Sequence, residues 1–360
     1  MEGKYSRVGN CQCWSPQPGK WVKGKLIGSG SFGTVHLAIS KSTGGLFVVK
    51  QSRSDAGLEA LENEVKILKS LKSSPYIVQC LGIEKSEGNL SVLMEYMAGG
   101  SVADVAQKFG GSLEEEVVRL YTREMLKGLK YLHHHGIVHC DIKCKNVLLG
   151  SSGDIKLADF GCAKRLEDLK GSGGLMKSLN SIGGTPLWMA PEVLRNERLD
   201  SAADIWSLGC TVIEMATGRP PWGSDVTNPM AALLKIARGN EIPQFPSHFS
   251  KEGLDFLAKC LERDPAKRWT ADKLLNHPFV SGKSRRSSQR EHACSPSSVL
   301  EVQRFDDGYD SDEAETPEGD DFSTRKPFTW RHGEGKATAL WPWGDSKFGS
   351  SGNWIAVRSG

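Results

Sequence analysis

The chain has 360 residues, of which 38% are hydrophobic and 25% are charged, and its formal net charge is +3. This balance is typical of soluble globular proteins. No run approaches the roughly 20 consecutive apolar residues that span a bilayer, and the first residues lack the apolar core of a secretion signal. We therefore expect a protein of the cytoplasm, the nucleus or both, with no membrane partner and no nucleic-acid partner.

The first third of the chain is predicted to be rich in strands after a polar extension over residues 1–20. Strands are predicted over 21–27, 35–39, 46–50 and 91–96. Residues 57–71 carry apolar side chains at helical spacing and predict an amphipathic helix. A small, mainly β region should therefore precede a larger, mainly helical one, with the junction at residues 95–100.

Helices dominate the pattern from residue 112 onward, as in residues 114–133 and 202–217. The helical region is predicted to end near 277–279, which makes 21–280 one domain. A tail over residues 281–360 follows, and its segment 301–321 has a net charge of −9, so that the rest of the chain carries +12. So acidic a segment, with little to bury, predicts disorder. For the tail beyond residue 281 the hypothesis is a regulatory rather than catalytic role, and the alternative is a solvated stalk that affects only abundance or localisation.

A glycine-rich stretch follows the first predicted strand. Glycines at 28, 30 and 33 would let a backbone hairpin approach a polyphosphate closely, because no side chain intervenes. Taken alone, this motif is as consistent with a plain glycine-rich hairpin. The dinucleotide fingerprint is a second alternative, but it needs a following helix, and a β-branched strand follows here.

Lys50 lies at the end of a predicted strand, 17 residues after Gly33. A lysine there can hold phosphates as a point charge, and it needs an anion to orient it. Glu64 on the predicted helix is the preferred partner because its face borders the apolar stripe, and Glu62 is the alternative.

Two groups of metal-binding residue types are interpreted as structural. His133, His134 and His135 stand at a predicted helix end, which explains them better than a metal site. Cys140, Cys144 and Cys162 could form a redox cluster, but no feature of the sequence indicates a lowered thiol pKa. The nine cysteines are scattered and are expected to be thiols.

Seven motifs in fixed order resemble the catalytic domain of protein kinases over residues 21–280. They are 28–35, Lys50, Glu64, 139–141, Asn146, 159–161 and 190–192. The resemblance implies an α+β fold, the bilobal protein kinase fold, with a small mainly-β N-lobe and a larger mainly-α C-lobe. It also implies ATP and Mg²⁺ as cofactors.

The resemblance assigns roles to single residues. Asp141 would orient the substrate hydroxyl or accept its proton, and Lys143, typical of the serine/threonine class, would stabilise the transferring phosphate. Asn146 and Asp159 would bind the metal. Thr185 would bond to the catalytic Asp and Lys. The residues expected to bind the nucleotide are Ile27, Gly28, Ser29, Gly30, Ser31, Phe32, Gly33, Thr34, Val35, Lys50, Glu64, Glu95, Met97 and Leu148.

Three further features are expected to belong to the scaffold or to regulation. Glu192 should pair with Arg268 in a buried ion pair. Asp204 opens the helix that should support the catalytic loop. Cys140 stands where the family usually has an arginine that reads a phosphate on the activation loop. Because a cysteine cannot do so, loop phosphorylation is not expected to be the switch.

Residues 94–102, 139–146 and 184–193 closely resemble the MAP kinase kinase kinase group of the MEKK type, in particular its short plant members. That resemblance implies a MAP kinase kinase, phosphorylated on its activation loop, as the substrate, and a place in a stress or hormone signalling cascade. The alternatives are a kinase-fold scaffold without activity, or an active serine/threonine kinase outside these cascades. The oligomeric state is left open.

Overall fold

The computed structural model describes Pro16 and residues 19–30, 33–52, 54–86, 89–170, 183–223 and 229–282. All of them belong to one compact unit, and a second unit over residues 294–349 lies entirely outside the described residues. The predicted disordered tail beyond residue 282 therefore lies outside the described part of the chain, as does nearly all of the extension over residues 1–20.

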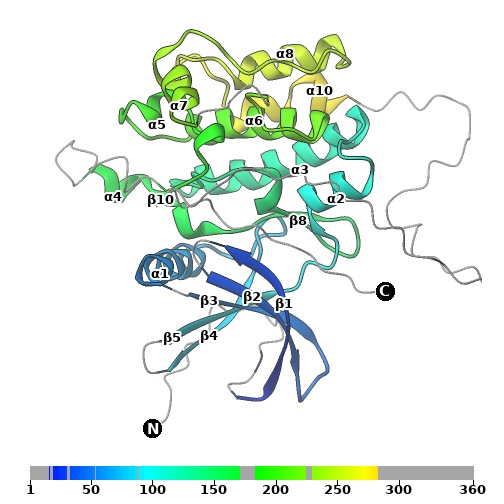
Figure 1. Ribbon diagram of the computed structural model, residues 1–360, viewed down its shortest axis with the longest axis vertical. Coiled ribbons are helices and arrows are strands. Elements are labelled where there is room, and N and C mark those ends of the chain that lie inside the picture. Colours follow the sequence, from blue (N-terminus) through cyan, green and yellow to red (C-terminus); the bar gives the residue numbers. More distant parts are fainter. Residues whose placement is uncertain are drawn as a thin grey trace, which may run out of the picture. The chain divides into compact units, whose positions relative to one another are not determined.

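The N-lobe is a five-stranded antiparallel sheet with one long helix, as the strand-rich pattern predicted (Figure 1). The strand order is β1-β2-β3-β5-β4. The elements are β1 (Trp21–Gly30), β2 (Gly33–Ser40), β3 (Leu46–Ser52), α1 (Asp55–Ser70), β4 (Cys80–Ser86) and β5 (Asn89–Glu95). The sequence pattern missed β4, an edge strand with a register shift between Cys80 and Gly82.

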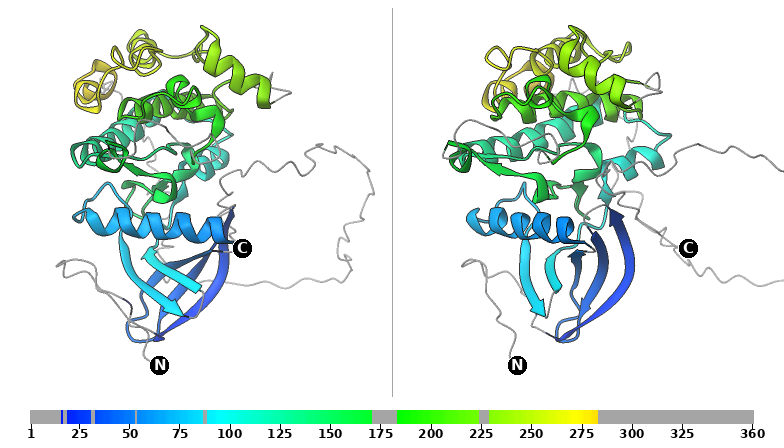
Figure 2. Two further views of the ribbon diagram at one scale, coloured as in Figure 1. Left: turned by 90° about the vertical axis from the view of Figure 1, so that its left-hand side faces the viewer. Right: turned by 60° about the vertical axis from the view of Figure 1, so that its left-hand side comes forward.

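Apolar side chains are buried on both faces of this sheet, and neighbouring residues of a strand lie on opposite faces because side chains alternate along it. Phe47 and Leu93 are buried on one face, where the Trp21 ring packs edge-on against Phe47 at 5.9 Å. Val92 and Met94 are buried on the other face with apolar side chains of α1. Both views of Figure 2 show α1 between the sheet and the helices of the C-lobe.

Helix α1 begins two residues earlier than its apolar spacing predicted. Ser54 caps it, because its side chain accepts a hydrogen bond from the Gly57 amide at 3.1 Å, and Asp55 lies in the first turn near the positive end of the helix dipole. The side chains of Leu61, Glu64 and Ile67 are buried and face the rest of the protein. The capping residue, not the apolar stripe, determines where this helix starts.

The C-lobe is mainly helical, as predicted. Its longer helices are α2 (Val102–Lys108), α3 (Glu115–His134), α6 (Ala202–Thr217), α7 (Pro229–Arg238) and α8 (Lys251–Cys260). The shorter ones are α4 (Leu166–Lys170), α5 (Pro191–Leu194), α9 (Ala271–Leu275) and α10 (Pro278–Ser281). Helix α6 is buried along almost its whole length, which its largely apolar sequence explains. Among the described residues, no helix is both long and apolar enough to cross a bilayer.

The segments next to the junction of the lobes contain short strands and 3₁₀ turns. Strands β6 (Gly100–Ser101), β8 (Val147–Leu149) and β9 (Ile155–Leu157) form one small sheet, and β7 (Ile137–Val138) pairs with β10 (Lys164–Arg165). The 3₁₀ turns are η1 (Cys144–Asn146), η2 (Phe160–Cys162) and η4 (Pro186–Trp188). The segment between β7 and β8 is thereby anchored at both ends.

The predicted ion pair between Glu192 and Arg268 is present and almost completely buried. The two guanidinium nitrogens of Arg268 donate to the two carboxylate oxygens of Glu192 at 2.7 and 3.1 Å. Arg268 also donates to the carbonyl oxygens of Glu262 and Ala202. A buried arginine with all of these partners joins α5 to α6 and to the segment before α9.

We predict that Arg268→Met lowers the free energy of unfolding by about 3–5 kcal/mol, because the Glu192 carboxylate would stay buried without its partner. Urea denaturation of the purified chain measures this loss. The control is Arg195→Met, which breaks the exposed pair with Glu197 and should cost less than about 1 kcal/mol. Equal losses in the two variants would contradict a structural role for the buried pair.

Candidate active site

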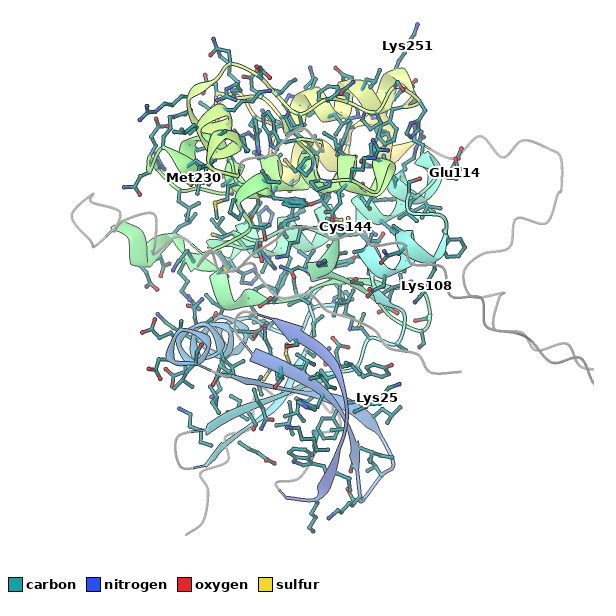
Figure 3. All side chains as sticks on the ribbon, in the orientation of Figure 1. Lys25, Lys108, Glu114, Cys144, Met230 and Lys251 are labelled. Atoms are coloured by element: carbon teal, nitrogen blue, oxygen red, sulfur yellow. The ribbon has the colours of Figure 1, made fainter. Side chains whose placement is uncertain are left out.

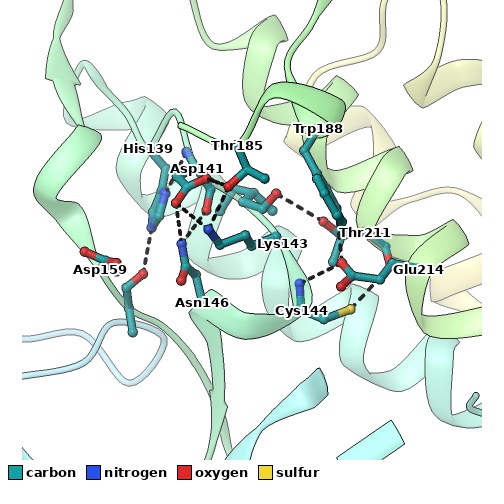
Figure 4. Close-up of polar contacts among 12 residues, drawn as sticks. His139, Asp141, Lys143, Cys144, Asn146, Asp159, Thr185, Trp188, Thr211 and Glu214 are labelled. Atoms are coloured by element: carbon teal, nitrogen blue, oxygen red, sulfur yellow. Dashed lines mark hydrogen bonds and ion pairs between the residues drawn. The ribbon is translucent and has the colours of Figure 1, made fainter. Parts of the chain in front are cut away.

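The loop between β7 and η1 brings three of the predicted site residues together (Figure 4). The Lys143 ammonium lies 3.0 Å from Asp141 Oδ2. The Asn146 side-chain amide donates to Asp141 Oδ2 and to the Asp141 carbonyl oxygen, both at 2.8 Å. All three side chains are nearly inaccessible to solvent. Their positions are therefore determined by one another and leave little conformational freedom.

Thr185 makes both contacts that were predicted for it. Its hydroxyl donates to Asp141 Oδ1 at 2.7 Å and accepts from the Lys143 ammonium at 2.7 Å. The segment that precedes η4 is thus attached to the catalytic loop, 44 residues away from Asp141 in sequence. Asp141 has one oxygen bound by Thr185 and the other by Asn146 and Lys143, which orients its carboxylate.

Asp204, at the start of α6, binds the backbone of the catalytic loop, as expected. Its completely buried carboxylate accepts hydrogen bonds from the amides of His139 and Cys140, each at 2.9 Å, and from His133 Nε2 at 2.9 Å. Burial would raise the pKa of Asp204, but the contacts with His133 and His139 together outweigh it and lower the pKa. Cys140 has a φ of 66°, a conformation that costs a non-glycine residue about 1–3 kcal/mol and that the two amide bonds help to maintain.

A second carboxylate on α6 joins the catalytic loop to η4, and the sequence analysis missed it. Glu214 accepts from the Cys144 amide at 3.0 Å and from Trp188 Nε1 at 3.1 Å (Figure 4). Burial raises the pKa of Glu214. No motif signalled this residue, because its partners lie 70 and 26 residues away in sequence.

Lys50 binds two carboxylates at once. Its ammonium lies 2.7 Å from Glu64 Oε2 and 2.9 Å from Asp159 Oδ1. Glu64 is therefore the partner, and the alternative is wrong: Glu62 lies on the exposed side of α1, where its carboxylate pairs with Lys85 at 3.7 Å. Burial would lower the pKa of Lys50, but the charges of Asp159 and Glu64 outweigh it and raise the pKa above its ordinary value.

Asp159 has a left-handed backbone, with φ 67° and ψ 77°, which costs roughly 1–3 kcal/mol in a non-glycine residue. The next residue is held firmly: Phe160 is fully buried, its ring lies 4.8 Å from that of His139, and its amide donates to Glu64 Oε1 at 3.2 Å. Burial opposes ionisation of Asp159, but the charge and hydrogen bond of Lys50, together with Lys143 and His139, outweigh it and lower the pKa of Asp159. The carboxylate is therefore ionised at neutral pH.

A pocket lies between the lobes next to these charges. Ile27, Val35 and Leu148, three of the residues expected to bind the nucleotide, line it. Val35, Lys50 and Val92 stand opposite one another on adjacent strands, so that Lys50 reaches the pocket from the middle of the sheet. Lys25 and Lys108, labelled in Figure 3, line it from different lobes. The lining residues that the sequence analysis did not assign to the nucleotide are Lys25, Val78, Met94, Tyr96, Ala98, Gly99, Gly100, Ser101, Asp104, Lys108 and Ala158, with Asp159 predicted only as a metal ligand.

Glu95 and Met97 also line the pocket, but the Glu95 side chain has another partner. Lys156 on β9 donates to both of its oxygens, at 2.7 and 2.9 Å, and the Gln79 amide donates to Oε1 at 2.6 Å. The carboxylate therefore fixes the junction of the lobes. Any contact of Glu95 with a nucleotide would have to come from its backbone.

The glycine-rich stretch forms the tip of the β1–β2 hairpin, where Gly30 pairs with Gly33. Ser31 and Phe32 lie outside the described residues, and Gly28, Ser29, Gly30, Gly33 and Thr34 are in the two strands. Position 33 requires glycine for a structural reason as well, since a Cβ there would collide with the Gln51 carbonyl oxygen of β3. Its lack of a side chain thus serves strand packing as well as any approach to phosphates.

The donors around Asn146 and Asp159 fit a hard divalent cation. Asn146 Oδ1 is buried and accepts no hydrogen bond from any described residue, which is costly unless another ligand satisfies it. Together with the Asp159 carboxylate it offers the oxygen donors that Mg²⁺ prefers. The residues therefore fit the predicted metal.

The histidines and thiols that could have been a metal or redox site have separate partners. His133 binds Asp204, His134 binds Asp272 at 3.0 Å, and His135 Nδ1 contacts the Tyr131 carbonyl at 2.8 Å. The part of the chain that the structure describes holds no cluster of three metal-binding side chains. Burial raises the thiol pKa of Cys140, Cys144 and Cys162, the opposite of what redox-active cysteines need.

A two-lobed fold with this pocket, two carboxylates, an amide and two lysines defines a protein kinase of the serine/threonine class. Comparison with known families agrees: residues 21–280 match the protein kinase domain. The chain is 43% identical over 295 residues to mitogen-activated protein kinase kinase kinase 2 of Arabidopsis thaliana, covering 78% of this chain and 44% of that protein. It is 43% identical over 274 residues to mitogen-activated protein kinase kinase kinase 18 of the same plant, which covers 73% of this chain and 78% of that protein.

A similar relative outside plants is mitogen-activated protein kinase kinase kinase A of Dictyostelium discoideum, 42% identical over 270 residues, which cover 72% of this chain and 28% of that protein. The chain thus spans less than half the length of several relatives and more than three quarters of others. The chain belongs to the protein kinase family and, within it, to the mitogen-activated protein kinase kinase kinases.

We predict that Lys50→Met reduces phosphoryl transfer by at least about three orders of magnitude, because positioning and charge supply most of the catalysis. A radiolabelled ATP assay measures the loss. The variant should still fold, with a lower melting temperature than the wild type because Glu64 and Asp159 lose their buried partner. The control is Lys85→Met, which removes an exposed lysine of the same lobe. Turnover within ten-fold of wild type in the Lys50 variant, on the order of 1 kcal/mol of barrier, would sink the assigned role.

Proposed function

We propose that this protein is an active serine/threonine kinase that transfers the γ-phosphate of ATP to a protein substrate. Asp141 orients the acceptor hydroxyl and takes its proton as the oxygen attacks the γ-phosphorus. Lys143, 3.0 Å from Asp141, lies where it can balance charge on the transferring group. The bond from the γ-phosphorus to the bridging oxygen breaks, and ADP leaves with the electron pair.

The remaining residues hold the nucleotide and the metal. Lys50 pairs with the phosphates while Glu64 orients it, and the pocket between the lobes takes the adenine. Asp159 and Asn146 would hold Mg²⁺, which neutralises the phosphate charge when bound. The residues predicted to bind the nucleotide would contact ATP in and around this pocket.

One observation carries the proposal: Asp141, Lys143, Asn146 and Thr185 are joined in a single hydrogen-bonded network. A scaffold without catalysis would not need an oriented acid–base carboxylate. The network stands beside an Asn146 oxygen that no described residue satisfies, which supports metal-dependent chemistry over mere partner binding.

We propose a MAP kinase kinase as the substrate, phosphorylated on serine or threonine of its activation loop. The support is the identity of 43% to relatives named as mitogen-activated protein kinase kinase kinases, two of which this chain covers to 78% of their length. A stress or hormone cascade is the corresponding biological setting. An active kinase outside these cascades is the remaining alternative.

The test is phosphorylation of a panel of catalytically inactive MAP kinase kinases by the purified full chain. We expect transfer to at least one member, and none from the matched Asp159→Ala variant, which lacks a metal ligand. Nucleotide binding without transfer to any protein or peptide would favour the scaffold. Transfer to a generic peptide alone would leave a kinase but refute the proposed substrate.

We predict that activity does not depend on phosphorylation of the activation loop. Cys140 replaces the phosphate-reading arginine, and its thiol contacts the Val138 carbonyl at 3.6 Å. Phosphatase-treated protein should keep most of its activity, as should a variant with Ser172, Ser178 and Ser181 changed to alanine; these serines lie outside the described residues. Collapse of activity would mean that another cation reads the phosphate, and Lys164, opposite Val138 on β10, would be the first to test.

A further inference from the structure

The side chain of Asn63 on α1 reaches three backbone carbonyl oxygens of the segment after Asp159. Its amide nitrogen lies 3.3 Å from the oxygen of Phe160, 3.0 Å from that of Gly161 and 2.9 Å from that of Ala163. Three acceptors around one point require the NH₂ group of the side chain to face them, because the amide oxygen would be repelled. With two protons for three acceptors, the longest contact, to Phe160, is shared.

Asn63 belongs to the face of α1 that packs against η2. Residues 60, 63, 64 and 67 lie on the same side of a helix. A Cβ added to Gly161 would lie only 3.3 Å from Ala60 Cβ, so this backbone packs tightly on the helix. Glu64 accepts the Phe160 amide and Asn63 binds the Phe160 carbonyl, so both polar backbone groups of this residue are held from α1.

The segment needs such support for two reasons. Asp159 has a left-handed backbone that an L-residue rarely adopts, so it relaxes unless its neighbours hold it. In addition, three carbonyl oxygens directed at one point repel one another unless a donor lies between them. The Asn63 amide supplies that donor and carries no net charge that would disturb the nearby Lys50, Glu64 and Asp159.

We propose that Asn63 is a positioning residue that holds the backbone after Asp159, so that the Asp159 carboxylate stays directed toward the metal and Lys50. This inference rests on the proposed kinase function. Asn63 acts from within the folded domain and requires no modification. It thereby supplies a constraint on the activation segment that does not depend on an arginine at position 140.

Two substitutions separate this role from simple packing. Asn63→Asp keeps the shape but places a carboxylate against three carbonyl oxygens, whereas Asn63→Ala only removes the donor. If Asn63 acts through its hydrogen bonds, the isosteric Asp variant is the more damaged one. If it only fills space, the smaller Ala variant is. The control is Glu62→Gln, an exposed neighbour on the same helix.

The first measurement is amide hydrogen exchange of the metal-free full chain, read at Phe160 and at Ala163, whose amide donates to the Phe160 carbonyl. We expect exchange at both amides to accelerate at least about ten-fold in Asn63→Asp and less in Asn63→Ala. The Glu62→Gln variant should exchange like the wild type.

The second measurement is the rate of peptide phosphorylation against Mg²⁺ concentration. We expect kcat to fall about ten-fold or more in Asn63→Asp, with a higher Mg²⁺ concentration at half-maximal rate. Wild-type exchange in Asn63→Asp, or a larger effect of Asn63→Ala, would overturn the proposal. If the wild type itself lacks activity, the proposed function fails, whereas the order of the exchange rates still decides the role of Asn63.

Discussion

The ammonium group of Lys50 lies between the carboxylates of Glu64 and Asp159, and three parts of the molecule meet there. Lys50 comes from β3, Glu64 from α1, and Asp159 from the segment before η2, 109 residues beyond Lys50 in sequence. Each of these charges would be costly to bury alone, and together they satisfy one another. The position of α1 relative to the sheet and to the catalytic loop therefore follows from the need to pair buried charge.

Within the C-lobe, helix α6 holds separate segments together through buried carboxylates, as Lys50 does between the lobes. It is an apolar, buried helix that nevertheless carries Asp204 and Glu214. Both carboxylates accept backbone amide protons of the catalytic loop, which adds to the contacts that the loop makes within itself. The Thr185 hydroxyl and the Trp188 indole then attach the segment around η4 to the same support. Residues of the candidate site on two separate segments are thus placed with the help of one buried helix.

The replacement of arginine by Cys140 removes a cation from the surroundings of the activation segment, and the rest of the site remains assembled without it. The left-handed backbone at Cys140 is maintained by Asp204, and the one at Asp159 adjoins the contacts from α1. Both strained residues are therefore held by hydrogen bonds from a helix. This arrangement supports the proposal that the site does not need an added phosphate to bring its parts into register.

The sequence by itself was sufficient for most of the longer elements and for locating the residues to which the chemistry is assigned. Apolar spacing predicted α3, α6 and most of the sheet, and the motifs located Asp141, Asn146 and Asp159, because these residues have fixed neighbours along the chain. The tertiary structure decided the rest. It selected Glu64 over Glu62, turned the Glu95 carboxylate to Lys156, and brought Asn63 to carbonyl oxygens about 100 residues away. Such contacts depend on which faces meet when the lobes pack, and no local pattern encodes them, since pairing across the fold is determined by burial and charge.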